Sequence, residues 1–357
     1  MDWSADKIEA FRKTLLAWYD QEGRALPWRV DHDPYHVMVS EIMLQQTQVE
    51  TVKPYYARFL KQFPTAAALA DAPEALVLKA WEGLGYYSRA RNLQRAAQQI
   101  TQEHGGVWPQ TADELVKLAG IGPYTAGAIA SIAFNQPEPA IDGNAFRVFA
   151  RLFCIEDDIT LPKTRRVFDT LIRQLIDPDR PGDFNQAIMD LGSTYMRAKD
   201  PDAAHSPVAA FDASLAANRV LDFPVKTKKK PPVVVPYYAL VIYSDQGYLL
   251  VKRPKTGMLA NMWMFPLIKR TDLTADTLDD ARATAAKMIG HAVYLTAAGT
   301  QVVKHTFTHQ QWQLTLLTAE ASAFDVTDFG GRWVQAANFD ELALPTVQKK
   351  LIRVAIK

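Results

Sequence analysis

Two acidic residues stand inside otherwise apolar stretches of the sequence, where a carboxyl group is chemically informative. Glu41 lies in the mostly apolar run 39–49, and Asp142 lies in the run 140–148 as part of Asp-Gly-Asn. Two carboxyl groups in different environments can supply one protonated acid and one ionised stabiliser of positive charge. Taken singly, Glu41 is also compatible with a surface glutamate paired with lysine, and Asp142 with a plain turn before a helix capped by Asn144.

A glycine-rich hairpin, LAGIGPYTAG at residues 118–127, is the second feature with chemical potential. Gly120 and Gly122 permit a tight turn and close approach of the backbone to another molecule. Pro123 suits the first turn of a helix, whose outward-facing amides can bind an anion. An ordinary helical hairpin with a glycine turn is the alternative that this motif alone leaves open.

The elements that must position these residues are helices in the first part of the chain. The pattern of apolar residues predicts helices at 7–20, 36–50, 73–83, 86–100, 111–119, 124–134, 144–153, 164–176 and 184–192. The proline- and lysine-rich run 223–232 then indicates a linker. Its lysines either are simply solvated or contact phosphates.

After the linker the pattern changes towards strands. A hairpin is predicted at 237–243 and 248–251, a helix at 274–290, and further strands at 311–318 and 331–335. We therefore divide the chain into a helical domain at 1–220, a linker at 221–235 and an α+β domain at 236–357.

The composition limits the class of protein. The 357 residues are 48% hydrophobic and 22% charged, a composition typical of globular proteins. Because the net charge is only +1, any surface that binds nucleic acid must be a local concentration of basic residues. Cys154 is the single cysteine, which excludes an intrachain disulfide and a site held by several cysteines, and we interpret it as a buried apolar residue. Because neither a membrane-spanning run nor a signal-peptide pattern is present, we expect a cytoplasmic protein.

Three motifs taken together resemble those of the MutY-type adenine DNA glycosylases, within the endonuclease III or helix-hairpin-helix superfamily. They are SEIMLQQTQV at 40–49, GPYTAG at 122–127 and IDGN at 141–144, and the resemblance extends over essentially the whole chain. It implies an N-terminal all-α helix-hairpin-helix glycosylase fold and a C-terminal α+β Nudix-like domain. The implied activity is removal of adenine, flipped out of DNA, in base excision repair.

The resemblance assigns the chemistry to four residues. It makes Glu41 the acid that protonates adenine at N7, so that the base leaves neutral, and Asp142 the group that stabilises or covalently traps the cationic sugar. Asn144 would orient Asp142 or the water. Tyr124 stands where lyase members carry a Schiff-base lysine, and a phenol cannot form a Schiff base, so a monofunctional glycosylase is implied.

Further residues are implied to bind the extruded base and the DNA. The adenine pocket would comprise Trp28, Arg29, Leu44 and Gln186, with a core aromatic as the alternative role of Trp28. Gln46 would act as a wedge in the DNA helix that offsets the cost of unstacking the adenine. The remaining DNA-binding candidates are Thr47, Gly120, Gly122 and Thr125.

Most members of the family hold a [4Fe–4S] cluster with four cysteines after an Asp-Leu-Gly motif. At the corresponding positions this chain has Tyr195, Asp202, His205 and Phe211. Because Fe–S clusters require thiolate ligands, we predict no cluster and no other cofactor. We expect Tyr195 and Phe211 to fill the vacated volume.

The C-terminal domain is expected to read the base opposite the adenine. Residues 256–266 resemble the entry to the Nudix-like domain, and HTFTH at 305–309 resembles the loop that reads 8-oxoguanine. Phe307, Thr308 and His309 are the candidates, with Thr308 in place of the usual serine but retaining its hydroxyl. The alternative is a strand end with two exposed histidines. Since 279–290 lacks clustered glutamates, we predict no pyrophosphohydrolase activity.

The sequence thus predicts a monomeric enzyme that acts on double-stranded DNA containing 8-oxoguanine·adenine or guanine·adenine mispairs. We expect no association with a membrane. A bifunctional lyase of the same fold is opposed by Tyr124. A non-catalytic DNA-lesion binder is opposed by the presence of both Glu41 and Asp142. A Nudix hydrolase with a helical appendage is opposed by the missing glutamates.

Overall fold

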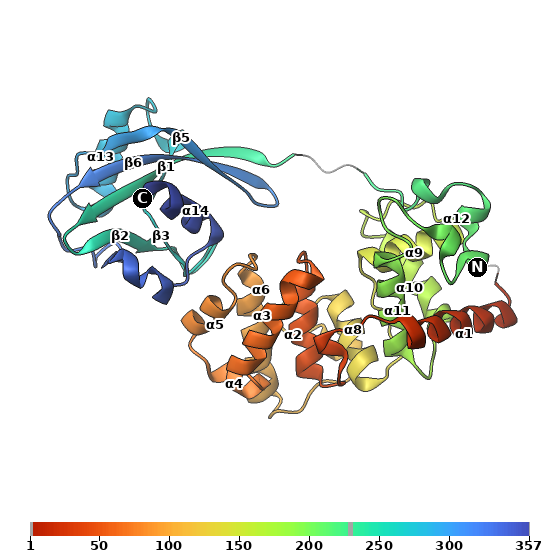
Figure 1. The fold of residues 1–357 in the computed structure, drawn as a ribbon. Coiled ribbons are helices and arrows are strands. Elements are labelled where there is room, and N and C mark those ends of the chain that lie inside the picture. Colours follow the sequence, from red (N-terminus) through yellow and green to blue (C-terminus); the bar gives the residue numbers. More distant parts are fainter. Residues whose placement is uncertain (1–2, 228–230, 357) are drawn as a thin grey trace. The chain divides into compact units, whose positions relative to one another are not determined.

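The computed structural model describes residues 3–227 and 231–356, so Lys228–Lys230 of the predicted linker lie outside the described residues. Contacts divide the chain into two compact units (Figure 1). The helical unit comprises Met1–Asp71 and Arg91–Lys228, and the mixed unit comprises Ala72–Ala90 and Lys229–Lys357. Within the described ranges, no helix has both the length and the apolar character needed to cross a membrane.

The first part of the chain is helical throughout, as predicted. Its helices are α1 (Ala5–Glu22), α2 (Pro34–Leu44), α3 (Val49–Gln62), α4 (Ala66–Asp71), α5 (Glu74–Ala80), α6 (Ser88–Gln98), α7 (Ala112–Leu115), α8 (Pro123–Phe134), α9 (Gly143–Phe153), α10 (Thr164–Leu175), α11 (Pro181–Ser193) and α12 (Ala213–Ala216). A 3-10 helix, η1 (Pro27–Arg29), and a π-helical segment (Gln99–Glu103) interrupt the series.

The stretch 36–50 is not the single helix that the sequence pattern predicts. Helix α2 ends at Leu44, Gln46 adopts a left-handed conformation with φ of +59°, and α3 begins at Val49. A left-handed residue cannot continue a right-handed helix, so the chain turns here. Two helices with a tight turn between them replace the expected long one.

Helices α2 and α8 form the centre of the helical unit. They pack against each other, and each is apolar on almost all sides, which is the pattern of a fully buried helix. Gly127 of α8 allows the segment before α9 to pack closely on this helix, because a Cβ at Gly127 would lie 2.2 Å from the Pro139 carbonyl oxygen. The two helices therefore hold the motifs at 40–49 and 122–127 against each other.

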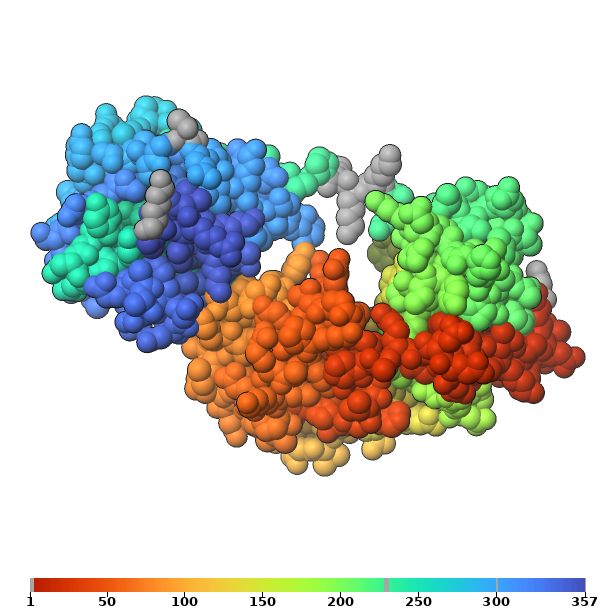
Figure 2. Space-filling model, viewed as in Figure 1, coloured from red at the N-terminus to blue at the C-terminus, as the bar shows by residue number. Residues whose placement is uncertain are grey.

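A second hydrophobic core lies between α1, α9, α10 and α11. Phe11 and Leu15 of α1 pack there with Phe149, Phe168 and Phe184, one from each of the other helices. In the space-filling view α1 forms a red ridge along the surface of the helical unit, and it contacts α11 (Figure 2). This core carries the helix whose first residues follow Asp142.

The mixed unit contains a seven-stranded sheet. Five of its strands follow the order β3-β2-β1-β6-β5, and the other two, β4 and β7, pair with β1 and β2 respectively. The strands are β1 (Val233–Ser244), β2 (Gly247–Lys252), β3 (Trp263–Met264), β4 (Leu267–Lys269), β5 (Thr296–Thr306), β6 (Gln310–Glu320) and β7 (Gly331–Val334). Strands β1 and β6 run parallel, and the other pairs are antiparallel.

Helices α13 (Leu278–Ile289) and α14 (Thr346–Ala355) cover opposite faces of this sheet. Ala239 and Val241 of β1 belong to the core that includes Val347 of α14. Leu240 belongs to the other core, with Ala281 of α13. This alternation follows from the two-residue period of a strand. The predicted combination of an all-α and an α+β domain is confirmed.

Residues 72–90, which include α5, group with the mixed unit and not with the helices that precede and follow them in the sequence. Asn261 donates a hydrogen bond of 2.7 Å to Glu74, and Lys349 forms an ion pair of 2.7 Å with Glu82. A pattern of helical residues alone carries no sign of this grouping. Our division of the chain at residues 221–235 stays a proposal.

Candidate active site

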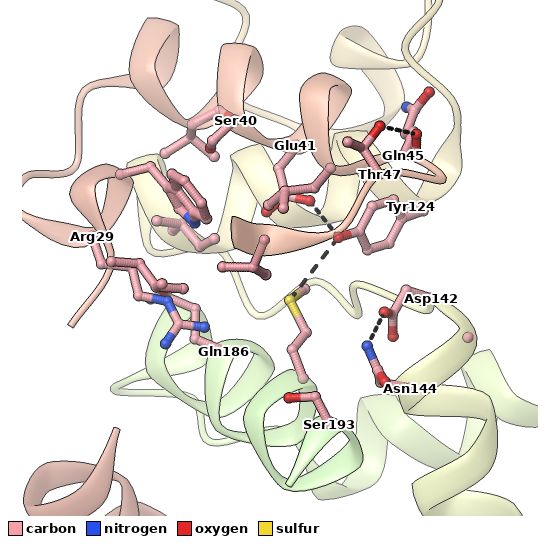
Figure 3. Close-up of a pocket in the computed structure, with 18 of the residues that line it drawn as sticks. Arg29, Ser40, Glu41, Gln45, Thr47, Tyr124, Asp142, Asn144, Gln186 and Ser193 are labelled. Atoms are coloured by element: carbon pink, nitrogen blue, oxygen red, sulfur yellow. Dashed lines mark hydrogen bonds between the residues drawn. The ribbon is translucent and has the colours of Figure 1, made fainter. Parts of the chain in front are cut away.

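Glu41 occupies the most buried stretch of α2, where every residue from Val37 to Met43 is buried. Its side chain is only 5% exposed, and the Tyr124 hydroxyl donates a hydrogen bond to Oε2 (Figure 3). Burial raises the pKa of Glu41 to about 7, aided by the charge of Asp142 and opposed by the Tyr124 hydroxyl and Arg29. A carboxyl group in this environment is protonated for much of the time at neutral pH and can act as an acid.

Tyr124 is the second residue of α8, directly after Pro123. Burial, followed by the charges of Glu41 and Asp142, raises the pKa of Tyr124 well above its usual value. The side chain therefore remains a neutral phenol and a hydrogen-bond donor. The structure places it between Glu41 of α2 and Asp142 at the start of α9.

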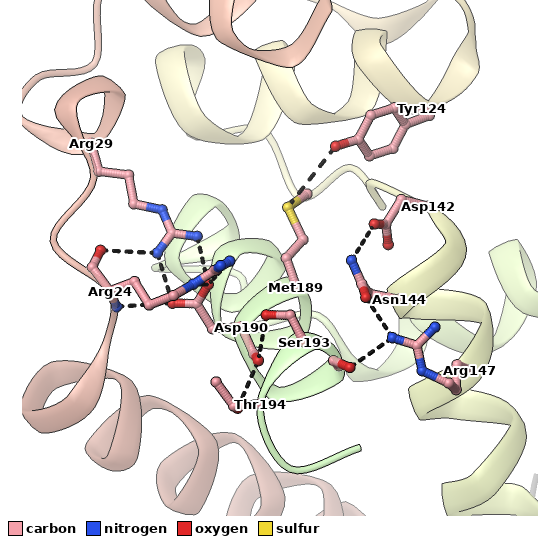
Figure 4. Close-up of polar contacts among 11 residues, drawn as sticks. Arg24, Arg29, Tyr124, Asp142, Asn144, Arg147, Met189, Asp190, Ser193 and Thr194 are labelled. Carbon is pink, nitrogen blue, oxygen red and sulfur yellow. Dashed lines mark hydrogen bonds and ion pairs between the residues drawn. The ribbon is translucent and has the colours of Figure 1, made fainter. Parts of the chain in front are cut away.

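Asp142 is the N-cap residue of α9, and its Oδ1 accepts a hydrogen bond of 2.7 Å from the Ala145 amide. Its Oδ2 accepts a hydrogen bond of 2.7 Å from Asn144 Nδ2, and Arg147 in turn donates to Asn144 Oδ1 at 2.6 Å (Figure 4). Burial raises the pKa of Asp142, but these hydrogen bonds and the charge of Arg147 oppose the rise. The cap of this helix is thus Asp142 itself and not Asn144.

The two acids differ in how the protein stabilises their ionised forms. The Asp142 carboxylate accepts from an amide at a helix start and from Asn144, whereas Glu41 accepts from the Tyr124 hydroxyl. Because hydrogen bonds to an anion favour ionisation, Asp142 is the better-stabilised carboxylate and Glu41 the better proton donor. This geometry supports the division of roles that the family resemblance implies.

A cavity of about 590 Å³ brings the predicted catalytic and adenine-binding residues together. Its lining includes Glu41, Tyr124, Asp142, Asn144, Trp28, Arg29, Leu44 and Gln186. Trp28 is also a core residue that packs edge-on against Tyr56 at 5.5 Å, and its role in binding adenine stays a prediction. The volume lies within the range of about 300–1,000 Å³ typical of small-ligand pockets.

The turn between α2 and α3 lies at the mouth of this cavity. Gln45, Gln46 and Thr47 all line it, and Gln46 is exposed. Thr125 of α8 is 1% exposed, and its hydroxyl accepts a hydrogen bond of 3.4 Å from Gln45. Its side chain therefore supports this turn from within the protein.

The hairpin consists of α7, a turn and α8. Helix α7 is shorter than predicted, ending at Leu115, and Thr111 and Glu114 form a capping box at its start. Gly120 has a φ of +74°, a backbone conformation that only glycine adopts without strain. Gly122 is the N-cap of α8, and a Cβ at this position would point into open space. An anion can therefore approach the backbone at Gly122.

Several residues of the site carry no motif that reveals them in the sequence. Arg147 also donates to the Gly192 and Met196 carbonyl oxygens at 2.6 Å, which joins α9 to the end of α11. Met189 Sδ lies 4.0 Å from the Tyr124 hydroxyl (Figure 4). Asp190 binds both Arg24 and Arg29. The sequence signal for Asp190 is the Asp-Leu-Gly motif at 190–192, which precedes the cluster positions.

The four positions that would hold an iron–sulfur cluster have other contacts. Tyr195 packs edge-on against Trp18 at 6.0 Å, and Phe211 packs with Phe11 at 5.5 Å. Asp202 and His205 form an exposed hydrogen bond of 2.6 Å. None of these side chains is a thiolate, and the described residues contain no group of three or more acidic, histidine or cysteine side chains placed to hold a metal. These residues do not fit a [4Fe–4S] cluster.

The proposed 8-oxoguanine loop lies between β5 and β6 in the mixed unit. Phe307 packs edge-on against Trp312 at 4.9 Å, and the His309 carbonyl oxygen accepts from the Val233 amide. The Thr308 hydroxyl lies 2.8 Å from the hydroxyl of Tyr86, a residue with positive φ that no sequence motif indicates. Gly83 and Gly85 directly precede Tyr86 in the sequence, and both have positive φ.

Comparisons with known proteins agree with this architecture. Residues 39–174 match the family of HhH-GPD superfamily base excision DNA repair proteins, and residues 237–354 match the NUDIX domain family. The adenine DNA glycosylase of Rattus norvegicus is 36% identical, with 97% of this chain and 78% of that protein covered. The adenine DNA glycosylase of Homo sapiens is 36% identical, with 98% of this chain and 74% of that protein covered.

Solved structures resemble the helical part. A thermostable thymine-DNA glycosylase has a TM-score of 0.54 and 24% identity, covering 59% of this chain and 98% of that chain. Endonuclease III in a non-covalent DNA complex has a TM-score of 0.50 and 21% identity, covering 59% and 97%. At this level of identity the likeness concerns the fold alone.

Proposed function

The chain belongs to the adenine DNA glycosylase family, and we propose that it hydrolyses the N-glycosidic bond of adenine mispaired with 8-oxoguanine or guanine in double-stranded DNA. The observation that carries this proposal is the convergence of Glu41, Tyr124 and Asp142 on one cavity. Adenine flipped from the helix would enter this cavity, at a cost of a few kcal/mol for unstacking.

Glu41 donates its proton to N7 of the adenine, which turns the departing base into a neutral leaving group. Its burial and its pKa of about 7 support this role. Asp142 faces the sugar as an anion and stabilises the positive charge that develops as the C–N bond breaks, or bonds to it. Asn144 holds Asp142 in place. Water then completes hydrolysis at the sugar.

Other lining residues select and hold the base. Arg29, Trp28 and Leu44 form the walls, and Gln186, 7% exposed, offers an amide that can both donate and accept hydrogen bonds. The exposed Gln46 on its left-handed turn is suited to enter the DNA helix where the adenine leaves. The backbone at Gly120 and Gly122 and at the start of α8 would bind a phosphate.

The mixed unit would read the opposite base through Phe307, Thr308 and His309. The Thr308 hydroxyl can both donate and accept a hydrogen bond. Further parts of the proposal are that the protein works as a monomer in the cytoplasm, forms no Schiff base and uses no cofactor. The presence of Tyr124 in place of a lysine and the absence of cysteines other than Cys154 support the last two points.

The decisive experiment is single-turnover excision of adenine from a duplex with one 8-oxoguanine·adenine pair, with guanine·adenine and thymine·adenine duplexes for comparison. We expect Glu41→Gln to lose about 10²–10⁴-fold in rate, because the amide cannot donate a proton to N7 as an acid does. Glu50→Gln on α3 is the matched control, since Glu50 is an exposed residue paired with Lys53. Full activity of Glu41→Gln would exclude the mechanism.

A further inference from the structure

Asp190 on α11 is a buried carboxylate that the proposed chemistry does not use. It is 1% exposed and lies between two arginines (Figure 4). Arg29 donates to its two oxygens at 2.7 and 3.0 Å, which is a bidentate pair. Arg24 donates from Nε at 2.7 Å and from its backbone amide at 3.0 Å. Such geometry fixes the orientation of the two guanidinium groups and also balances part of their positive charge.

The charge that Asp190 balances lies at the wall of the adenine cavity. Arg29 and Arg24 both line the cavity that contains Glu41. The groups that face Glu41 are Tyr124 from α8, Asp142 from the cap of α9 and Arg29 from η1. Of these, Arg29 is the permanent cation, and a cation beside a carboxyl group favours loss of its proton. Arg29 itself faces Asp190, the Tyr19 ring and Glu41.

We propose that Asp190 is a positioning residue that holds the Arg29 guanidinium against the cavity wall and neutralises its charge, so that Glu41 keeps its proton until adenine arrives. This inference rests on the proposed role of Glu41 as the acid. Without Asp190, a buried and unpaired guanidinium would draw the Glu41 carboxylate towards itself and compete with adenine for it. Neither Arg24 nor Asp190 needs to contact the reacting atoms.

The charge of the Arg24–Asp190–Arg29 cluster makes the idea testable in two directions. Two guanidinium groups and one carboxylate give the cluster a net charge of +1. Asp190→Asn raises this charge to +2, and Arg24→Met lowers it to zero. The double variant returns it to +1. A residue that only supports the fold would not shift a titration in opposite directions on these opposite changes.

The experiment measures single-turnover adenine excision against pH for the full chain and these three variants. Since Glu41 must be protonated to act, the wild-type rate is expected to fall as pH rises through about 7. In Asp190→Asn the midpoint of this fall should move down by about one pH unit, making excision about 10-fold slower on the alkaline side. In Arg24→Met it should move up, but less, because Arg24 is 32% exposed and its charge is screened.

The double variant should return the midpoint towards the wild-type value. Thermal unfolding of each variant shows whether it folds, and the partly exposed Arg24 leaves a usable variant if Asp190→Asn does not fold. Equal rate losses at every pH, or a midpoint that stays in place in Arg24→Met, would overturn the positioning role. A wild-type protein that does not excise adenine would instead overturn the proposed function.

Discussion

At the scale of single residues, this site depends on giving two carboxyl groups different surroundings. Both Glu41 and Asp142 are buried, and burial raises the pKa of each. The amide of Ala145 and the side chain of Asn144 oppose this rise at Asp142 and keep it suited to be an anion. Glu41 has the Tyr124 hydroxyl as its hydrogen-bond donor, and this contact opposes the rise of its pKa.

The pH dependence of excision should therefore respond to Tyr124. Its hydroxyl favours the ionised form of Glu41 and lowers the pKa of this acid, so Tyr124→Phe should raise that pKa. Because the active form is protonated, the fall in rate with rising pH should move to higher pH in the variant. Single-turnover rates across the neutral and alkaline range test this. Tyr294→Phe, an exposed position in the mixed unit, is the control and should change nothing.

An unchanged or lower midpoint in Tyr124→Phe would show that this hydroxyl does not act on the ionised form of Glu41. The readout is a midpoint on the pH axis and not a rate. A general loss of activity through weaker binding of DNA would therefore leave the midpoint in place and would not be mistaken for the predicted effect.

At the scale of elements, the close packing of α8 against α2 and against the segment before α9 positions the catalytic groups. Gly127 faces the Pro139 carbonyl oxygen so closely that no side chain fits, whereas Gly122 faces open space. The first glycine serves packing, and the second leaves the backbone of the hairpin accessible. Two glycines in one motif thus have separate physical roles.

Alanine at each glycine should separate these roles. Gly127→Ala forces a methyl group against backbone and should lower the free energy of unfolding by about 1–3 kcal/mol. Gly122→Ala should cost less than about 1 kcal/mol in stability, as expected for a cap position, yet weaken DNA binding by obstructing the phosphate. Chemical denaturation and duplex affinity at several salt concentrations measure the two effects. Wild-type stability of Gly127→Ala would contradict the packing role.

At the scale of the whole molecule, the chain is stabilised by several cores and, as we propose, without an iron–sulfur cluster. Aromatic side chains occupy the region after α11, where Phe211 contacts both Phe11 and Trp3. Tyr195 packs on Trp18 and donates to Glu22 at 3.3 Å. In the mixed unit, helices on both faces of the sheet complete two further cores. Such packing can supply the support that metal–thiolate bonds give elsewhere.

Iron analysis tests this view of the molecule. Protein produced with iron and sulfide in excess should contain far less than one iron per chain, because no set of thiolates exists to hold a cluster. Excision should be unaffected by an iron chelator. A content of about four irons per chain would contradict the prediction, and loss of activity on chelation would show that a metal matters.

Much of the architecture was predictable because it depends on local pattern. Helical periodicity identified most helices of the first part, and alternation identified the strands around 237–251 and 311–318. The break after Leu44 was not predictable in this way, since the residues from 45 to 48 fit a helix in the sequence pattern, whereas in the structure the chain turns there. The grouping of residues 72–90 with the mixed unit likewise depends on distant side chains.

For the site, the sequence by itself determined which residue types are available: a glutamate and an aspartate in apolar runs, a tyrosine where a lysine would make a lyase, and a single cysteine. Sequence motifs reveal these residues because each motif is a short contiguous segment of the chain. Only the tertiary structure decided that Glu41 is buried beside Tyr124, that Asp142 caps α9, and that Asp190 holds Arg24 and Arg29. The reason is physical: a protonation state depends on burial and neighbouring charge. At Glu41 and Asp190 the hydrogen-bond partners Tyr124 and Arg29 lie more than 80 positions away in the sequence.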